Sequence, residues 1–389
     1  METTAIVTTT AGILIGYFSA EAPTVTNFER LFWPQRFYYS INPLSLFKTA
    51  LLMPIGGVLH KAVLESLDQF QQTGLLSLWR AHGHMLGTPF YRDVEYQLVR
   101  RDGTPREARN GFLISILEHC ARTTLSHYAG PHEHARSNQT VCLLTLFVGN
   151  FPTTPKVSLV DETSKSYLRS LLGILASESV AMGLGFWVAI SYKTWFASLW
   201  FIPVFVKILS IFLSLRREPL DTQLSATDKA DMSDLHLYHR RDGFMILRGP
   251  SKILDQFSTH YGHPIRSKPR ELLFIFSLIV LDLVYPCGMT FLSWVPNAVQ
   301  IAWLAYLLFV TVAMHVYRYC GGELVGSIQE VIGDALLAEG HVCLEVGKDI
   351  PLQATLMVKI VDSVAQGRAV VSNFLNEFSD LGLDHKLQV

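Results

Sequence analysis

Four long apolar runs dominate the hydrophobic pattern of the chain. They are Leu168–Ile190, Trp195–Leu215, Leu272–Trp294 and Ala298–Tyr319. Each run supplies the roughly 20 residues that a helix needs to cross the hydrocarbon core of a bilayer. The connectors Ser191–Thr194 and Val295–Asn297 are so short that the helices they join must be antiparallel neighbours. The pattern therefore predicts two transmembrane hairpins, 168–215 and 272–319.

The stretches around these hairpins complete the expected organisation. Residues 61–167 form a cytoplasmic mixed region, 216–271 a cytoplasmic insertion and 320–389 a cytoplasmic amphipathic helical tail. Residues 1–60 hold two weaker apolar runs, Ala5–Ala20 and Asn42–Leu59, so a third membrane hairpin and six spans remain an alternative to four. The expected fold class is mainly α: a polytopic helical membrane protein with small mixed α+β cytoplasmic regions.

The distribution of positive charge predicts the orientation of the chain in the bilayer. The insertion Arg216–Arg270 is rich in lysine and arginine, whereas the two hairpin connectors hold Lys193 alone. Because Lys and Arg accumulate in cytoplasmic loops, the insertion, the N-terminal region and the tail are all expected in the cytoplasm. The expected location is an endomembrane or the plasma membrane, and the lipid bilayer is the first expected partner.

Three ionisable side chains interrupt the apolar runs. Glu178, Lys207 and Asp282 each lie ~12–15 Å from the cytoplasmic end of their helix, at 1.5 Å per residue. An unpaired charge at such a depth costs ~2.5–3.5 kcal/mol on insertion scales. We therefore expect Lys207 to pair with Glu178 on the adjacent helix, which leaves Asp282 as the freer acid. The pair has two interpretations, a structural ion pair and part of a catalytic site.

The polar regions show short elements of both kinds. The sequence pattern predicts a strand at Val94–Arg100, a helix at Gly111–Tyr128, a buried strand or helix at Val141–Phe151, a strand at Gly243–Leu247 and a helix at Ser251–Tyr261. After Gly321-Gly322, apolar residues recur at helical spacing in Leu324–Leu336 and again in Leu352–Leu381. These C-terminal helices are expected to pack on the chain's own domain, with a protein partner or the membrane surface as alternatives.

Metal, cofactor and nucleic-acid motifs are weak in this sequence. Histidines cluster at His82 and His84 and from His119 to His134, but their spacing matches no usual zinc motif, so we expect no metal site. Asp228, Asp231 and Asp234 are expected to belong to a solvated linker. The five cysteines form no CxxC pair, and the formal net charge of −1 gives no indication of nucleic-acid binding. No cofactor is expected.

One stretch resembles a group of fungal proteins. Asp242-Gly243-Phe244-Met245-Ile246-Leu247-Arg248-Gly249-Pro250, continuing to His260-Tyr261-Gly262-His263-Pro264, resembles uncharacterised multi-pass integral membrane proteins of filamentous fungi. The resemblance covers this insertion and the flanking spans. It implies a fungal source and a membrane location, and it implies no activity.

Three classes of function remain. The chain lacks a Walker loop, a dinucleotide fingerprint, a GxSxG elbow and an HExxH motif. A membrane-embedded enzyme would use Glu178 and Asp282 as acid or base on an apolar small molecule such as a terpenoid or lipid, with Lys207 as ion-pair partner. A non-catalytic membrane scaffold or regulator is the alternative. A transporter is less well supported because no inverted repeat is evident.

Overall fold

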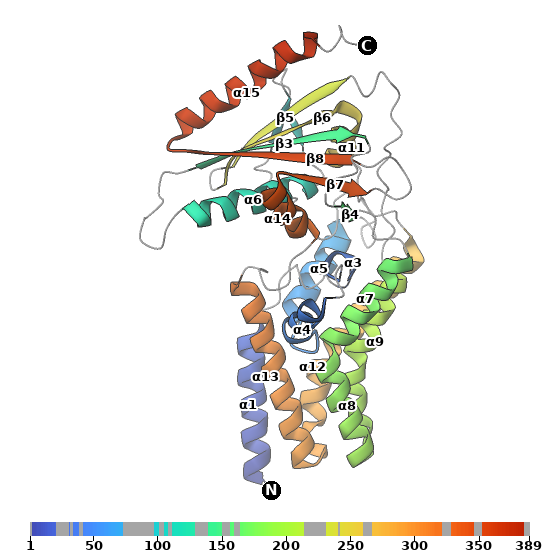
Figure 1. Ribbon diagram of the computed structural model, residues 1–389. Coiled ribbons are helices and arrows are strands. Elements are labelled where there is room, and N and C mark those ends of the chain that lie inside the picture. Colours follow the sequence, from blue (N-terminus) through green and yellow to red (C-terminus); the bar gives the residue numbers. More distant parts are fainter. Residues whose placement is uncertain are drawn as a thin grey trace. The chain divides into compact units, whose positions relative to one another are not determined.

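The chain folds into two compact units, each assembled from three separate stretches of sequence. The computed structural model describes residues 2–20, 31, 34–38, 42–72, 97–100, 105–107, 111–128, 139–149, 156–158, 164–213, 231–239, 242–259, 267–320, 328–345 and 352–384. Unit 1 comprises Met1–Gly87, Asp161–Arg216 and Pro264–Ser327. Unit 2 comprises Thr88–Val160, Arg217–His263 and Ile328–Val389. The fold is mainly helical, with one mixed sheet (Figure 1).

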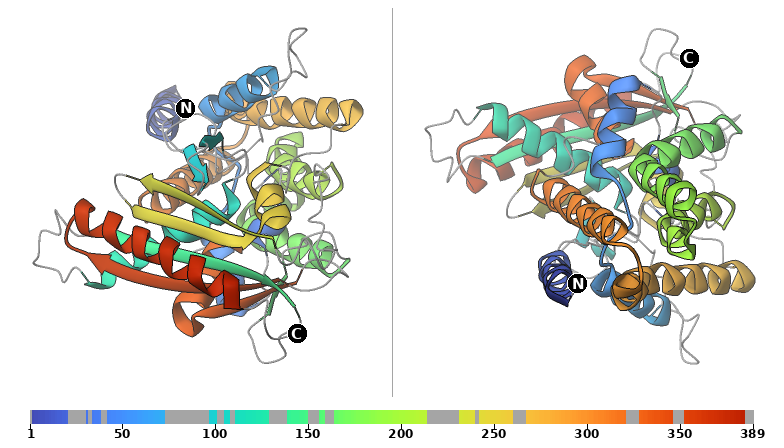
Figure 2. Two further views of the ribbon diagram at one scale, coloured as in Figure 1. Left: turned by 90° about the horizontal axis from the view of Figure 1, so that it is seen from above. Right: turned by 90° about the horizontal axis from the view of Figure 1, so that it is seen from below.

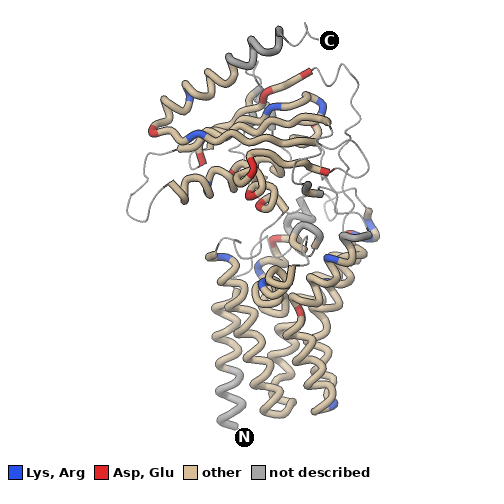
Figure 3. Tube along the Cα trace, in the orientation of Figure 1, with Lys and Arg blue, Asp and Glu red and all other residues tan. Residues whose placement is uncertain are grey.

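Unit 1 consists of helices. They are α1 (Glu2–Ala20), α3 (Pro34–Phe37), α4 (Pro43–Leu52), α5 (His60–Gln72), α7 (Ser164–Ser177), α8 (Ser179–Tyr192), η2 (Trp195–Ala197), α9 (Ser198–Leu213), α12 (Lys268–Phe291), η3 (Leu292–Trp294) and α13 (Asn297–Tyr319). Charged residues are sparse along the described parts of the long helices (Figure 3). The core of this unit centres on large aromatic side chains, including Trp200, Trp303 and Tyr306.

Three helices of unit 1 are long and apolar enough to cross a membrane. They are Trp195–Leu213, Lys268–Trp294 and Asn297–Tyr319. The fourth expected span is broken: Tyr167–Ser177 and Ser179–Tyr192 meet at a bend of 60°, so the pair is either one bent span or a re-entrant loop. The break falls at Glu178, whose side chain binds Lys207 and the backbone N–H of Ile55 inside the protein. Apolar composition alone could not reveal it.

The N-terminal stretch differs from the hairpin that the sequence suggested. The helix α1 packs mainly on α13, and its Gly12 and Gly16 also lie against Met289 and Tyr285 of α12. The expected return helix at Asn42–Leu59 is instead the ten-residue helix α4, capped by Asn42, followed by an extended segment from Met53 to Leu59. Pro54 lacks the N–H that would continue the helix. Every residue of this extended segment is buried.

Unit 2 is built on one eight-stranded mixed sheet. Its strands are β1 (Gln97–Arg100), β2 (Pro105–Glu107), β3 (Gln139–Val148), β4 (Lys156–Ser158), β5 (Met232–His239), β6 (Gly243–Pro250), β7 (His341–Glu345) and β8 (Leu352–Val361), in the order β2-β1-β5-β6-β3-β8-β7-β4. Strand β3 lies inside the sheet, parallel to β6 and antiparallel to β8. The three polar regions of the sequence therefore form a single structure and not three small ones.

Helices cover both faces of this sheet. The helices α6 (Phe112–Tyr128), α11 (Ser251–Thr259) and α14 (Ile328–Glu339) pack on the face formed by Cys142, Leu144 and Leu146, whereas α15 (Val364–Asp384) packs on the face formed by Val141 and Leu143. This alternation follows from the period of two along a strand. Figure 1 shows α15 on the side opposite α6 and α14, and the left view of Figure 2 shows α15 lying along the sheet.

The tail agrees with the sequence prediction in part. The helix expected at Leu324–Leu336 is present as α14, and it packs within the unit's own core. The helix expected within Leu352–Leu381 is present from Val364, but its predicted residues Leu356 and Ile360 lie instead in the strand β8, Leu352–Val361. Leu352, Leu356 and Ile360 are spaced by four, which suits one face of a strand as well as one face of a helix.

Candidate functional site

Lys207 and Glu178 form a buried ion pair in unit 1. The Nζ atom of Lys207 lies 2.5 Å from Oε1 of Glu178, and the two side chains are 1% and 0% exposed. The pairing predicted from the sequence is therefore confirmed. Further hydrogen bonds to two charges so far from solvent offset part of the cost of removing them from water.

Lys207 finds a partner for each of its three protons. Besides Glu178, its Nζ donates to the backbone oxygen of Met53 at 2.6 Å and to Oγ of Ser177 at 2.9 Å. Because an ammonium group has three donors, none is left over for a further ligand. On the other side of the pair, Oε1 of Glu178 accepts a second hydrogen bond, from the backbone N–H of Ile55 at 3.1 Å.

The pair therefore holds the extended Met53–Leu59 segment in place. Met53 supplies a carbonyl and Ile55 supplies an N–H, and each bonds one member of the pair. A buried backbone that is neither helix nor strand must satisfy its polar groups in this way. Gly56 and Gly57 allow the segment to pack directly against Tyr306 and Val310 of α13. A side chain at either position would collide with that helix.

Several polar atoms near this core have no hydrogen-bond partner among the described residues. They include Oε2 of Glu178, the hydroxyl of Tyr306 and the indole nitrogens of Trp200 and Trp303. The two tryptophan rings meet edge to face, with centroids 5.0 Å apart. The Met53–Leu59 segment thus bonds the ion pair directly, and these aromatic rings belong to the core of the same unit.

Asp282 lies apart from the pair. Its Oδ2 is 3.6 Å from Nδ1 of His60, the first residue of α5, and the two side chains are 24% and 69% exposed. The three charges that the sequence singled out therefore do not converge on one site, although Asp282 is separate from the Lys207 pair as expected. The sequence analysis missed His60, because it lies more than 200 residues away in a stretch with no motif.

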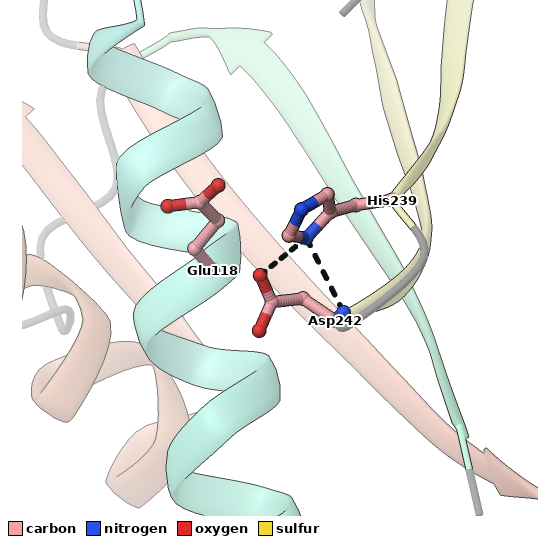
Figure 4. A group of neighbouring side chains, drawn as sticks. All are labelled: Glu118, His239 and Asp242. Carbon is pink, nitrogen blue, oxygen red and sulfur yellow. Dashed lines mark hydrogen bonds and ion pairs between the residues drawn. The ribbon is translucent and has the colours of Figure 1, made fainter. Parts of the chain in front are cut away.

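A second group of charged side chains lies in unit 2, between α6 and the β5–β6 hairpin (Figure 4). Asp242 is 2% exposed; its Oδ1 accepts from Nε of Arg122 at 3.1 Å, and its Oδ2 lies 2.5 Å from Nδ1 of His239. Arg122 also donates to Glu118 at 3.3 Å. One oxygen or nitrogen from each of Glu118, His239 and Asp242 lies within 4.8 Å of the others. We call these four residues the hairpin cluster.

Local structure explains how the chain builds the hairpin cluster. Glu118 and Arg122 are four residues apart on α6, so their side chains lie on the same face of the helix. His239 ends β5 and Asp242 directly precedes β6, and the antiparallel pairing of His239 with Gly243 brings them together. The next residue, Gly243, has a φ of 89° and packs on the backbone of Thr140. The hydroxyl of Thr140 donates to the carbonyl of Asp242 at 2.6 Å, which fixes Asp242 on β3.

Most of the histidines that drew attention in the sequence cannot be placed relative to this cluster. His82, His84, His132 and His134 lie outside the described residues, as do Asp228, His260 and His263. His119 lies on α6 but points to Asp334, 2.7 Å away. The signal that could have found the cluster was weak: a histidine and an aspartate three residues apart at a strand–turn–strand boundary.

Two buried cysteines of unit 2, Cys120 and Cys142, are poor nucleophiles. Burial raises the pKa of Cys142 to about 12 and raises that of Cys120 still further. Both side chains lie in the core below the sheet, and they are thiols at neutral pH. In β5, burial lowers the pKa of His236 from its usual 6.5, although the carboxylate of Asp234 opposes the shift.

Comparison with known proteins adds no relative to this description. The chain matches no protein-family model, no curated protein and no solved structure.

Proposed function

We propose that the chain is a multi-pass integral membrane protein and acts as a non-catalytic scaffold or regulator. The support for embedding is the surface of unit 1, whose long helices expose many large apolar side chains. Among them, the following are at least half exposed: Phe186, Ile190, Phe205, Phe212, Leu272, Phe276, Leu283, Trp294, Ile301 and Leu308. Contiguous exposure of this kind is costly in water and is expected where lipid covers the surface.

The sheet of unit 2 supports the proposed topology. Its strands β3, β6 and β8 come from three stretches of chain that are separated by the long apolar helices, yet they are hydrogen-bonded to one another. A single hydrogen-bonded sheet lies on one side of a bilayer. Each intervening stretch must then cross an even number of times, which suits one hairpin of α7–α8 with α9 and one of α12 with α13.

The lysine and arginine residues of the insertion support a cytoplasmic location for that side. Cysteine labelling tests the assignment: Ser191→Cys and Asn297→Cys, in the connectors, should react with an impermeant reagent only from the side opposite the exposed native Cys320. Labelling of a connector and of Cys320 from the same side would contradict the two-hairpin topology.

One observation favours a scaffold over an enzyme. Every donor of Lys207 is taken by a group of the protein, and both side chains of the pair are almost completely buried. Such an arrangement fixes helices and a backbone segment. A catalytic acid or base must instead reach its substrate. For a protein partner, α15 is the available C-terminal helix, since its outward residues Arg368, Ser372 and Asn373 are exposed.

The second candidate is a membrane-embedded enzyme acting on a terpenoid or other lipid. It is supported by the contact between His60 and Asp282, because both side chains are accessible and an imidazole beside a carboxylate is a common acid–base arrangement. In this reading Asp282 and His60 do the chemistry, and Lys207 with Glu178 only supports the fold.

Comparing lipid extracts separates the two candidates. A host that lacks the protein is made to express the wild-type chain, Asp282→Asn, or the matched control Glu271→Gln, which alters another carboxylate of α12. The scaffold predicts identical apolar metabolites in all three. A new or depleted lipid that depends on Asp282 and not on Glu271 would establish the enzyme and overturn the scaffold.

A further inference from the structure

We propose that the hairpin cluster is a binding site for a divalent transition metal, with Glu118, His239 and Asp242 as ligands and Arg122 as the group that a metal displaces. The proposal concerns unit 2 and is independent of the scaffold function. It also differs from the sequence expectation, which weighed other histidines and found no metal motif.

The ligand set suits zinc and similar ions. One imidazole nitrogen and two carboxylate groups are ligands that zinc, iron and manganese accept. Ligand atoms around a tetrahedral zinc ion lie about 3.3 Å apart, given metal–ligand bonds of about 2.0–2.2 Å. In the hairpin cluster all three ligand atoms already lie within 4.8 Å of one another, so small side-chain movements would suffice.

The elements that carry the ligands are well anchored. His239 ends β5, Asp242 is tied to β3 by Thr140, and Glu118 lies in the middle of a 17-residue helix that packs on the sheet. The hydroxyl of Thr140 bonds the carbonyl of Asp242 and leaves its side chain to the cluster. Held in this way, three ligands from two elements converge without a large change of the backbone.

In the structure Arg122 supplies the positive charge that a bound metal ion would supply. Its guanidinium donates to both carboxylates and neutralises part of their charge. A cation entering the cluster must compete with it. Arg122 can yield, because its side chain is 53% exposed and reaches solvent, whereas Asp242 is 2% exposed and has no such freedom. Metal binding would thus replace the guanidinium of Arg122 by the metal ion as the counter-charge of Asp242 and Glu118.

Because Arg122 competes with the metal, removing Arg122 and removing a ligand should change zinc affinity in opposite directions. The full-length protein, purified in detergent and stripped with a chelator, is titrated with zinc chloride by calorimetry, and its melting temperature is recorded with and without zinc. The wild type should bind about one zinc per chain. Arg122→Gln should bind zinc at least tenfold more tightly, because it removes the competitor but no ligand. Asp242→Asn and His239→Gln should each bind at least tenfold more weakly.

Two control variants exclude binding elsewhere. His119→Gln removes a histidine of α6 that contacts a carboxylate, Asp334, outside the cluster. The double variant His132→Gln/His134→Gln removes the densest histidine run of the sequence. Both should bind zinc as the wild type does.

The alternative is a purely structural cluster in which Arg122 fastens the hairpin to α6. It predicts no zinc binding by the wild type or by Arg122→Gln, and that result would overturn the proposal even if Asp242→Asn fails to fold. Zinc binding that survives Asp242→Asn but is lost in the His132/His134 variant would also overturn it.

Discussion

The Lys207–Glu178 pair and the hairpin cluster differ in how far their side chains are shielded from solvent. In unit 1, Lys207 and Glu178 are almost completely buried, and every lysine proton has a partner within the protein. In the hairpin cluster, Asp242 is equally buried, but its partner Arg122 is half exposed. A fully buried pair, which we call closed, cannot exchange one member for a solute from solvent. A cluster with one exposed member, which we call half-open, can exchange that member, here Arg122, for another cation. The difference suggests a structural role for the first group and a binding role for the second.

The largest expected effect comes from breaking the closed pair. Lys207→Met should lower the free energy of unfolding by about 3–5 kcal/mol, because it leaves the Glu178 carboxylate buried without a counter-charge. Glu178→Gln in the same chain should recover much of the loss, since both charges are then gone. Thermal melts of the single and double variants in detergent measure the effect. Additive losses without recovery would show that the two residues do not act as a pair.

A smaller loss of stability should follow from displacing the Met53–Leu59 segment, which the Lys207–Glu178 pair holds in place. Gly56→Ala places a methyl group against the hydroxyl of Tyr306 and should cost about 1–3 kcal/mol by overpacking. Tyr306→Phe removes that hydroxyl, which has no described partner, and should be close to neutral alone.

In combination, Tyr306→Phe should recover part of the Gly56→Ala loss. Melting temperatures of the three variants test this. An equal loss in both backgrounds would place the extended segment elsewhere.

The half-open cluster should tolerate the loss of its cation better than the closed pair does. Arg122→Gln should cost about 1 kcal/mol, because the exposed side chain makes a solvent-screened interaction and His239 still contacts Asp242. Denaturant unfolding compares it with Lys207→Met. A loss as large as that of Lys207→Met would remove the contrast between the two groups.

The smallest expected effect is a pH dependence in unit 2. Because burial lowers the pKa of His236, the folded state binds this proton less readily than the unfolded state does. Its contribution to stability is present above pH 6.5 and is lost as the pH falls from there through the lower folded pKa.

The wild type should therefore lose more stability than His236→Gln between pH 7 and pH 5, in melts at both values. Other histidines titrate in both proteins and cancel in the comparison. Equal slopes for the two proteins would contradict the prediction.

The sequence revealed the apolar helices and the Lys207–Glu178 pair because both depend on local composition. A lysine within a run of apolar residues needs a carboxylate, and the adjacent helix offered one. The break at Glu178 was missed because the residues around it remain apolar or small. The strand β8 was missed because its apolar spacing suits two structures.

The architecture of unit 2 could not be read from the sequence. Its strands pair across stretches of chain that carry no mark of their partners, so three polar regions looked like three small ones. The hairpin cluster combines residues from positions 118, 122, 239 and 242, and only the sheet brings them together. His60 and Asp282 meet for the same reason.

The position of β3 has a consequence for synthesis of the chain on the ribosome. Thr145 of β3 pairs with Thr355 of β8, 210 residues later. At 5–20 residues per second, translation of that interval takes about 10–40 s, during which β3 has no β8 to pair with. Until β8 is made, β3 keeps one unpaired edge even when β6 has paired with the other, and such an edge favours aggregation of the nascent chain. Premature termination anywhere before β8 would leave every copy in that state permanently.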